Sequence, residues 1–224
     1  MDADRREFLK RMATVAGGVV LLPVVTGCPA PAQDAPKGED PQGSGPSEPT
    51  LTRPEGFDPI AYNRDRGNAG AIPESYWPSI NGPDGVNKHL GKHLPYFPAL
   101  EGVEAPAGFA ALMWGDPSKG YAKHPNAPKD ETNNNEGHWY NWIRVRKAVE
   151  GEAEELKSEF HGWPQVVEGD SGQYAVQGGG DITADAGKNT VYLVGLPKDV
   201  QPGDTVRIWA HCLTHGEYVD YITV

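Results

Sequence analysis

The second half of the chain is a series of short strand-like runs separated by glycine, proline and asparagine, and this pattern restricts the fold most. In several runs apolar and polar residues alternate, as Val206, Ile208 and Ala210 do against Arg207 and Trp209. Such alternation is typical of a strand with one buried face. About seven runs of this kind predict an all-β fold, an immunoglobulin-like antiparallel β-sandwich. The predicted strands cover residues 108–114, 139–149, 154–161, 173–177, 190–196, 205–211 and 218–224.

Two other segments complete the predicted domain. Residues 150–158 are rich in Glu and Ala, which favours a helix, but the strand-like runs around them favour a pair of strands that turns near Gly151. Residues 57–107 contain many glycines and prolines and show little periodicity. We therefore expect a loop-rich N-terminal extension wrapped on the sandwich.

The N-terminus has the features of an export signal. A polar head that contains Arg5-Arg6 is followed by a short apolar run that ends at Gly27-Cys28. This order is typical of a secretory signal rather than a membrane-spanning helix. The arginine pair resembles the twin-arginine (Tat) signal, and Gly27-Cys28 resembles the site at which bacterial lipoproteins are cut and acylated. We predict a lipoprotein-type signal over residues 1–28, with acylated Cys28.

The segment after the signal has the composition of a linker. Residues 29–55 are rich in Pro, Gly, Ser, Asp and Glu and contain no aromatic residue. Such a stretch cannot bury enough apolar surface to offset the entropy lost on ordering. We predict a disordered tether, followed by one domain over residues 56–224. The protein would then be exported to the periplasmic side of the cell envelope and held to a membrane through Cys28.

Charge and cysteine content argue against a nucleic-acid-binding protein and against a domain held together by disulfides. The formal net charge is −11, which disfavours a nucleic-acid partner. Cys28 and Cys212 are the two cysteines of the chain, so acylation of Cys28 would leave Cys212 without a disulfide partner. A lone cysteine in an exported domain requires another role.

Four of the seven histidines lie in local patterns that point, together with Cys212, to a metal site. The last pattern is a Cys-x-x-His turn that ends in glycine, which lets a thiolate and an imidazole reach the same ion from one loop. Imidazole suits iron, copper or zinc, and thiolate adds a soft donor. The patterns are Lys92-His93-Leu94-Pro95, His124-Pro125, Glu136-Gly137-His138 and Cys212-Leu213-Thr214-His215-Gly216.

In this order, the four patterns resemble the superoxide reductase family, the iron domain shared by neelaredoxins and desulfoferrodoxins. The resemblance extends from about residue 86 to the C-terminus. It implies a mononuclear Fe2+/Fe3+ site with four imidazoles in a plane, one thiolate below and the sixth position open. Superoxide would be reduced there to hydrogen peroxide, with electrons from an external donor. The implied ligands are His93, His124, His138, Cys212 and His215.

The resemblance also implies a role for Lys92, which would lie near the open position and attract the superoxide anion against the negative net charge. One departure is Gly91, because many family members carry Glu there. A second departure is the long polar loop over residues 126–135. The chain has no second cysteine-rich centre, so a two-iron architecture is excluded, and the oligomeric state stays open.

Several alternatives follow from the same residues. Lys88-His89-Leu90 repeats the first pattern, so His89 competes with His93, which is favoured because a proline follows it closely. We expect His161 and His211 to lie outside the site. The Cys-x-x-His turn also fits a blue-copper electron carrier, but residues 217–224 lack the axial Met of such a site. A third alternative is an iron domain that senses oxidants or passes electrons without catalysis.

Overall fold

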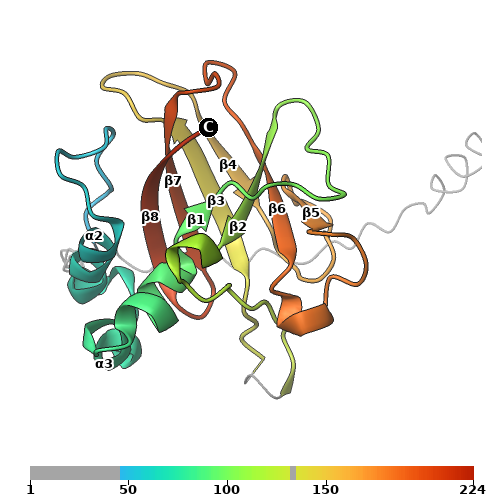
Figure 1. Ribbon diagram of the computed structural model, residues 1–224, viewed down its shortest axis with the longest axis horizontal. Helices are drawn as coiled ribbons and strands as arrows, with labels where there is room; N and C mark the ends of the chain where they lie inside the picture. Colours follow the sequence, from blue (N-terminus) through green and yellow to red (C-terminus); the bar gives the residue numbers. More distant parts are fainter. Residues whose placement is uncertain (1–45, 132–134) are drawn as a thin grey trace, which may run out of the picture. The chain divides into compact units, whose positions relative to one another are not determined.

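Two four-stranded antiparallel sheets form the body of the protein (Figure 1). The computed structural model describes residues 46–131 and 135–224. The strands run in the order β1-β2-β6-β5 in one sheet and β4-β3-β7-β8 in the other. Their bounds are β1 Pro95–Tyr96, β2 Phe109–Trp114, β3 Tyr140–Lys147, β4 Glu155–Glu159, β5 Gln173–Val176, β6 Thr190–Gly195, β7 Thr205–Cys212 and β8 Gly216–Thr223.

This architecture confirms the predicted all-β sandwich. Each of the seven predicted strands is present, and β3 pairs with β4 across the turn expected near Gly151. The two-residue strand β1 was not predicted, because it is too short to show alternation. The largest core cluster lies between the sheets and includes Leu112, Ile143, Val194 and Ile208. The sandwich is therefore held by the alternating apolar residues from which it was predicted.

The prediction of loops over residues 57–107 is wrong in part, because the segment contains two α-helices and several shorter turns of helix. Asp58 accepts hydrogen bonds from the first backbone amides of α2, and Pro59 occupies its first turn, a favourable arrangement for a helix start. These elements are too short to produce a clear helical period. Their bounds are α2 Pro59–Arg66, η1 Gly67–Ala71, η2 Glu74–Tyr76, α3 Trp77–Asn81, η3 Val86–Leu90 and η4 Gly91–His93, and further along the chain lie η5 Pro117–Lys119 and η7 Ala184–Gly187.

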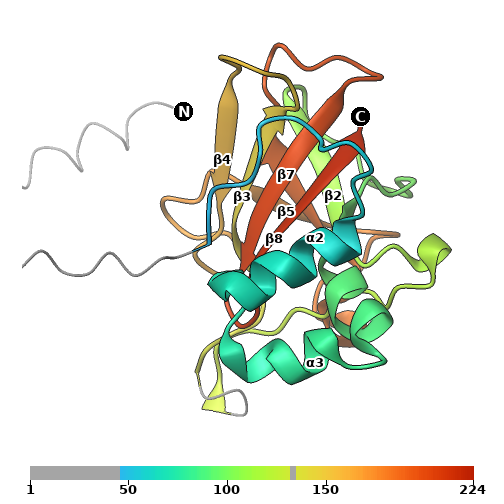
Figure 2. The same ribbon diagram turned by 90° about the vertical axis from the view of Figure 1, so that its left-hand side faces the viewer.

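Helix α2 lies against β8, the edge strand of its sheet (Figure 2). The Asn63 side chain accepts a hydrogen bond from the Val219 backbone N–H at 2.8 Å and donates one to the Val219 carbonyl at 2.7 Å. Asn63 is fully buried. A single amide side chain thus replaces the missing neighbour strand at this point and protects the edge from pairing with another chain.

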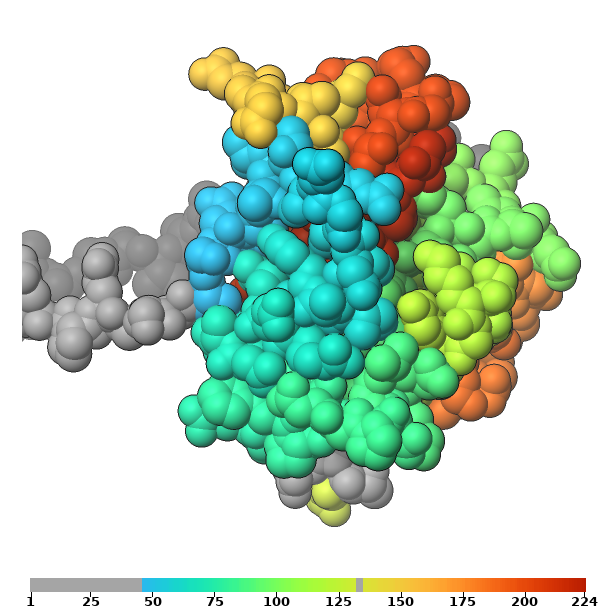
Figure 3. Space-filling view, turned by 60° about the vertical axis from the view of Figure 1, so that its left-hand side comes forward, coloured from blue at the N-terminus to red at the C-terminus, as the bar shows by residue number. Residues whose placement is uncertain are grey.

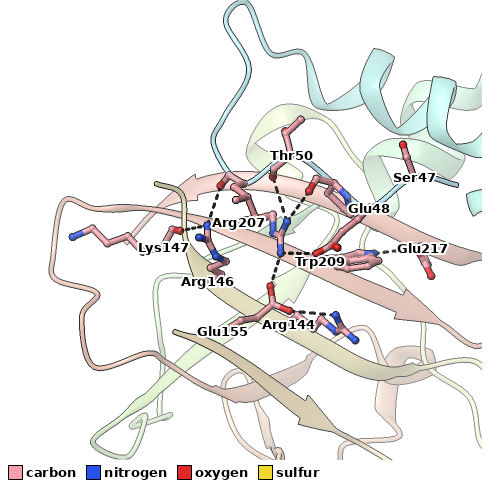
Figure 4. Close-up of polar contacts among 12 residues, drawn as sticks. Ser47, Glu48, Thr50, Arg144, Arg146, Lys147, Glu155, Arg207, Trp209 and Glu217 are labelled. Carbon is pink, nitrogen blue, oxygen red and sulfur yellow. Dashed lines mark hydrogen bonds and ion pairs between the residues drawn. The ribbon is translucent and has the colours of Figure 1, made fainter. Parts of the chain in front are cut away.

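Residues 46–55, which the sequence placed in the tether, make specific contacts with the sandwich instead (Figure 4). Arg207 donates a hydrogen bond to the Pro49 carbonyl at 2.7 Å and another to the Thr50 carbonyl at 3.3 Å. The Tyr221 hydroxyl also donates to the Thr50 carbonyl, at 2.5 Å. These contacts use backbone carbonyls, which every sequence offers, so composition could not reveal them.

The space-filling view shows the blue segment that begins at residue 46 and the teal helical residues side by side on one face (Figure 3). The predicted signal, Cys28 and the first part of the tether lie outside the described residues. Within residues 46–131 and 135–224, no helix is long and apolar enough to cross a membrane.

Candidate metal centre

The five residues expected to hold a metal come from four distant segments and meet at one end of the sandwich. One ligand atom from each lies within 4.8 Å of all the others. His93 ends η4, His138 precedes β3 and Cys212 ends β7. The remaining two are His124, in the loop after β2, and His215, in the turn between β7 and β8.

The turn that carries Cys212 and His215 requires a glycine at its end. Gly216 has φ +84°, and a Cβ there would lie 2.2 Å from the Ala71 carbonyl oxygen. No larger residue fits this close approach without moving the backbone. The glycine therefore lets the ligand turn pack directly against the helical segment.

The distances define how the four imidazoles are arranged. The His215 Nδ1 atom lies 3.2 Å from His93 Nε2 and 3.0 Å from His138 Nε2. The His124 ring contacts the other two, with ring centroids 4.9 Å from His93 and 4.4 Å from His138. The four imidazoles therefore surround a common centre in the order His93, His215, His138 and His124.

These spacings fit a metal ion. Two ligand nitrogens at about 2.1 Å from one ion and at a right angle lie about 3.0 Å apart, as the atoms around His215 do. The Cys212 Sγ atom lies 3.7 Å from His124 Nε2 and 3.6 Å from His215 Nδ1. The thiol thus lies next to His124 and His215, which face each other across the group of four imidazoles. One ion can therefore contact the thiol and all four imidazoles.

Burial sets the charge of the cluster. It lowers the pKa of His215 to about 2 and that of His138 to about 4, and lowers the pKa of His93 and His124 well below the usual value. These imidazoles are therefore neutral at pH 7 and keep a lone pair for a metal. Burial also raises the pKa of Cys212 to about 12. A thiolate in this place requires a nearby cation, which a metal ion would supply.

A second layer of contacts orients His93. Its Nδ1 atom lies 2.7 Å from the His89 carbonyl oxygen, to which it donates, so that Nε2 remains free for a metal. His89 itself is buried, and its Nε2 atom lies 2.9 Å from the Tyr218 hydroxyl. The structure thus places His93 in the cluster and His89 behind it.

Two other histidines lie outside the cluster. His161 is exposed and its Nδ1 atom lies 2.7 Å from an Asp170 carboxylate oxygen. The His211 Nδ1 atom lies 2.6 Å from the Asn141 side-chain oxygen, and its ring stacks on Trp142. Since neighbours on a strand face opposite sides, His211 points away from the adjacent Cys212, as expected.

Comparison with protein families finds no matching family, and no curated protein matches the chain. Among solved structures, the chain is similar to a superoxide reductase (neelaredoxin) from Archaeoglobus fulgidus in the reduced form. The identity is 18% and the TM-score 0.30, and the match covers 60% of this chain and 89% of the other. No functional argument is built on this similarity. The functional argument rests on the five side chains and their surroundings.

Lys92 lies close enough to the cluster to act on it electrostatically. Its charge contributes to the lowered pKa of all four histidines, and Cys212 in turn opposes the burial that lowers the pKa of Lys92. At the preceding position, a Cβ on Gly91 would lie 2.3 Å from the Tyr121 ring. A glutamate at position 91 therefore does not fit while Tyr121 keeps its place.

Three residues near the cluster were not predicted from the sequence. His89 and Tyr218 lie behind His93, and the Tyr76 ring packs edge-on against His215 with ring centroids 4.5 Å apart. Tyr76 comes from the helical segment that was expected to be loop. The repeated Lys-His-Leu pattern was the one available signal, and it pointed to His89 as a competing ligand rather than a supporting residue.

Proposed function

We propose that this protein is a superoxide reductase that holds one iron ion between His93, His124, His138, His215 and Cys212. The observation that carries the proposal is the convergence of four imidazole nitrogens and one thiol within 4.8 Å. Bound iron would supply the single electron that converts superoxide to hydrogen peroxide, and an external donor would restore it.

The chain's own residues prepare this chemistry. Cys212 is fully buried, so its thiolate would be shielded from water and would donate electron density strongly to the metal. The His93 imidazole is oriented by its hydrogen bond to the His89 carbonyl, which increases its basicity as a ligand. His138 is the most exposed of the five, which leaves a side from which a small anion can approach.

Lys92 is proposed to attract the substrate. A protein with a net charge of −11 repels superoxide at long range, and a cation beside the site offsets this repulsion locally. Lys92 is partly buried and acts on every histidine of the cluster, so its charge is directed at the site rather than at bulk solvent.

Two alternatives make different demands on the structure. A blue-copper carrier would use one upstream histidine, but both His124 and His138 lie in the cluster. A copper site of this kind also uses an axial Met. The one methionine within residues 46–131 and 135–224 is Met113 on β2, which packs in a separate core cluster of the sheet that does not contain Cys212. A non-catalytic iron domain would keep the same ligands, and superoxide consumption separates it from an enzyme.

The cellular setting remains a proposal from the sequence. We propose that residues 1–28 direct export, and that the mature protein is anchored to the membrane by a lipid on Cys28. Labelled fatty acid should be incorporated into the wild-type chain, and Cys28→Ala should abolish the incorporation and release the protein from membranes. Equal labelling of both chains would exclude lipidation at Cys28.

The activity test is to mix the iron-loaded, reduced protein with a known pulse of superoxide. We expect one hydrogen peroxide for each superoxide consumed and no release of dioxygen, because a reductase does not oxidise a second superoxide. Zinc-loaded protein is the matched control and should be inactive. Dioxygen release would indicate a dismutase, and no consumption would indicate a binding or electron-transfer domain.

A further inference from the structure

A cavity with a volume of about 550 Å³ opens between the edge strands β1 and β8 of the two sheets. Its lining includes Tyr96 from β1 and Asp220 from β8, together with Tyr121 from the loop after η5. Arg53 and Lys119 also line it. The cavity therefore combines aromatic walls with one acidic and two basic side chains.

Asp220 is the unusual member of this set. Its side chain is buried, with 4% of the residue exposed, and one carboxylate oxygen accepts a hydrogen bond from the Tyr221 backbone N–H at 2.7 Å. Burial raises its pKa to about 6, and the charges of Lys119 and Arg53 oppose that increase. A buried carboxylate is normally paired, but among the described residues no side chain hydrogen bonds to Asp220 or forms an ion pair with it.

The arrangement of charges restricts the ligand. An ammonium group would satisfy Asp220 but would be repelled by Arg53 and Lys119, and a simple anion would be attracted by the cations but repelled by the carboxylate. A neutral aromatic hydroxyl meets both demands, because it donates to the carboxylate and accepts from the cations. Its ring can pack against Tyr96 and Tyr121.

The cavity is connected to the metal cluster by packed side chains. Tyr121, which forms part of its wall, also packs in the core cluster that contains Tyr218. The Tyr218 ring lies on the His93 imidazole with centroids 4.3 Å apart. Tyr218 and Asp220 are two residues apart on β8 and so lie on the same face of the strand. A molecule in the cavity is thus close to the chain segment that contacts His93.

We propose that this cavity binds a hydroquinone, which serves as the electron donor of the metal centre. The proposal rests on the proposed superoxide reductase function. One hydroquinone and two superoxide anions, with two further protons, give one quinone and two molecules of hydrogen peroxide. The hydroquinone loses two electrons and two protons in total. Asp220 accepts a proton from the hydroxyl that faces it, while Arg53 and Lys119 stabilise the oxygen that becomes negative.

Binding can be tested without turnover in the zinc-loaded protein, which cannot exchange electrons. Menadiol, a soluble naphthohydroquinone, is titrated into the protein without oxygen and followed by calorimetry. We expect binding to the wild type and at least tenfold weaker binding to Asp220→Asn. The control Asp199→Asn changes an exposed carboxylate elsewhere and should bind as the wild type does. No binding to the wild type, or equal binding by Asp220→Asn, overturns the proposal.

A kinetic measurement separates this proposal from the proposed function. Menadiol should reduce the oxidised iron-loaded wild type faster than it reduces Asp220→Asn or Lys119→Ala, while ascorbate, a small general reductant, should reduce all three at the same rate. Superoxide consumption driven by ascorbate tests the enzyme alone. If that activity is present but menadiol reduces all variants equally, the hydroquinone site is wrong and the enzyme assignment stands. If menadiol binding depends on Asp220 but the protein consumes no superoxide, the hydroquinone site stands and the superoxide reductase assignment is refuted.

Discussion

The Tyr218 ring lies flat on the His93 imidazole, with centroids 4.3 Å apart and planes inclined by 8°. The Tyr218 hydroxyl also donates to the His215 carbonyl at 3.3 Å. One side chain on β8 therefore contacts two of the five residues in the candidate metal centre. Because Tyr218 is buried, it holds the His93 ring in one orientation.

Replacing this ring should loosen the metal. Loss of a residue that orients a ligand typically weakens metal binding by about tenfold or more, so we expect Tyr218→Leu to lower the affinity for zinc by about tenfold. Tyr218→Phe keeps the stacked ring and should retain most of the affinity. Competition with a coloured chelator measures both. Equal affinity of Tyr218→Leu and the wild type would show that the stacking has no such role.

Removing the positive charge next to the site should slow substrate capture. We expect Lys92→Ala to lower kcat/KM for superoxide by about tenfold and to reduce its dependence on ionic strength, since local charge steers an anion to its site. Lys88→Ala is the matched control, because Lys88 is exposed and paired with Asp84 at 2.6 Å. Similar losses in both variants would argue against a specific role for Lys92.

Asn63 covers the exposed edge of β8, so its replacement should lower the stability of the fold independently of metal binding. Asn63→Ala leaves the buried Val219 N–H and carbonyl without their partner, which should cost about 3 kcal/mol of unfolding free energy. Asn68→Ala removes an exposed side chain that bonds to Asn81, and should cost less than about 0.5 kcal/mol. Denaturant unfolding of both variants in the zinc-loaded form gives the comparison.

Asp220 predicts a dependence of stability on pH. Its pKa is about 6 in the folded protein against 3.8 for an ordinary, solvent-exposed aspartate, so between these two pH values the folded state holds a proton that the unfolded state has released. Stability from this group is greatest below pH 4 and falls as the pH rises to about 6, by about 3 kcal/mol in total. Asp220→Asn should therefore stabilise the protein at pH 8 and much less at pH 4.

Unfolding free energies of the wild type and Asp220→Asn at the two pH values test this directly. Arg53 and Lys119 are the charged groups that oppose the rise in the pKa of Asp220. A stabilisation that is the same at pH 4 and pH 8 would show that the Asp220 carboxyl titrates normally in the folded state.

The sandwich was predicted from local pattern, and local pattern also singled out the five side chains that converge in the structure. Strands such as β7 show their buried face as alternating residues, and the Cys212 turn brings two donors together within four residues. These features can be read without knowing the neighbours in space.

The parts that were missed depend on contacts between distant segments. The helices around Ile60 and Ile80 are short, and each contributes one fully or nearly buried isoleucine to the core cluster that contains Tyr218, so no helical period marks them in the sequence. Likewise the segment around Thr50 is fixed by Arg207 through backbone carbonyls. Both His89 and His93 lie in a Lys-His-Leu sequence, and the proline that follows favours His93, but only the fold shows that His93 joins the cluster while His89 lies behind it.

The most direct test of the central claim is the metal content and absorption spectrum of the purified domain. We expect one iron per chain and a thiolate charge-transfer band in the oxidised protein. Cys212→Ser should lose this band, and His161→Ala should retain it. Copper with an intense blue band, or a band that survives in Cys212→Ser, would contradict the assignment of the five residues to one iron site.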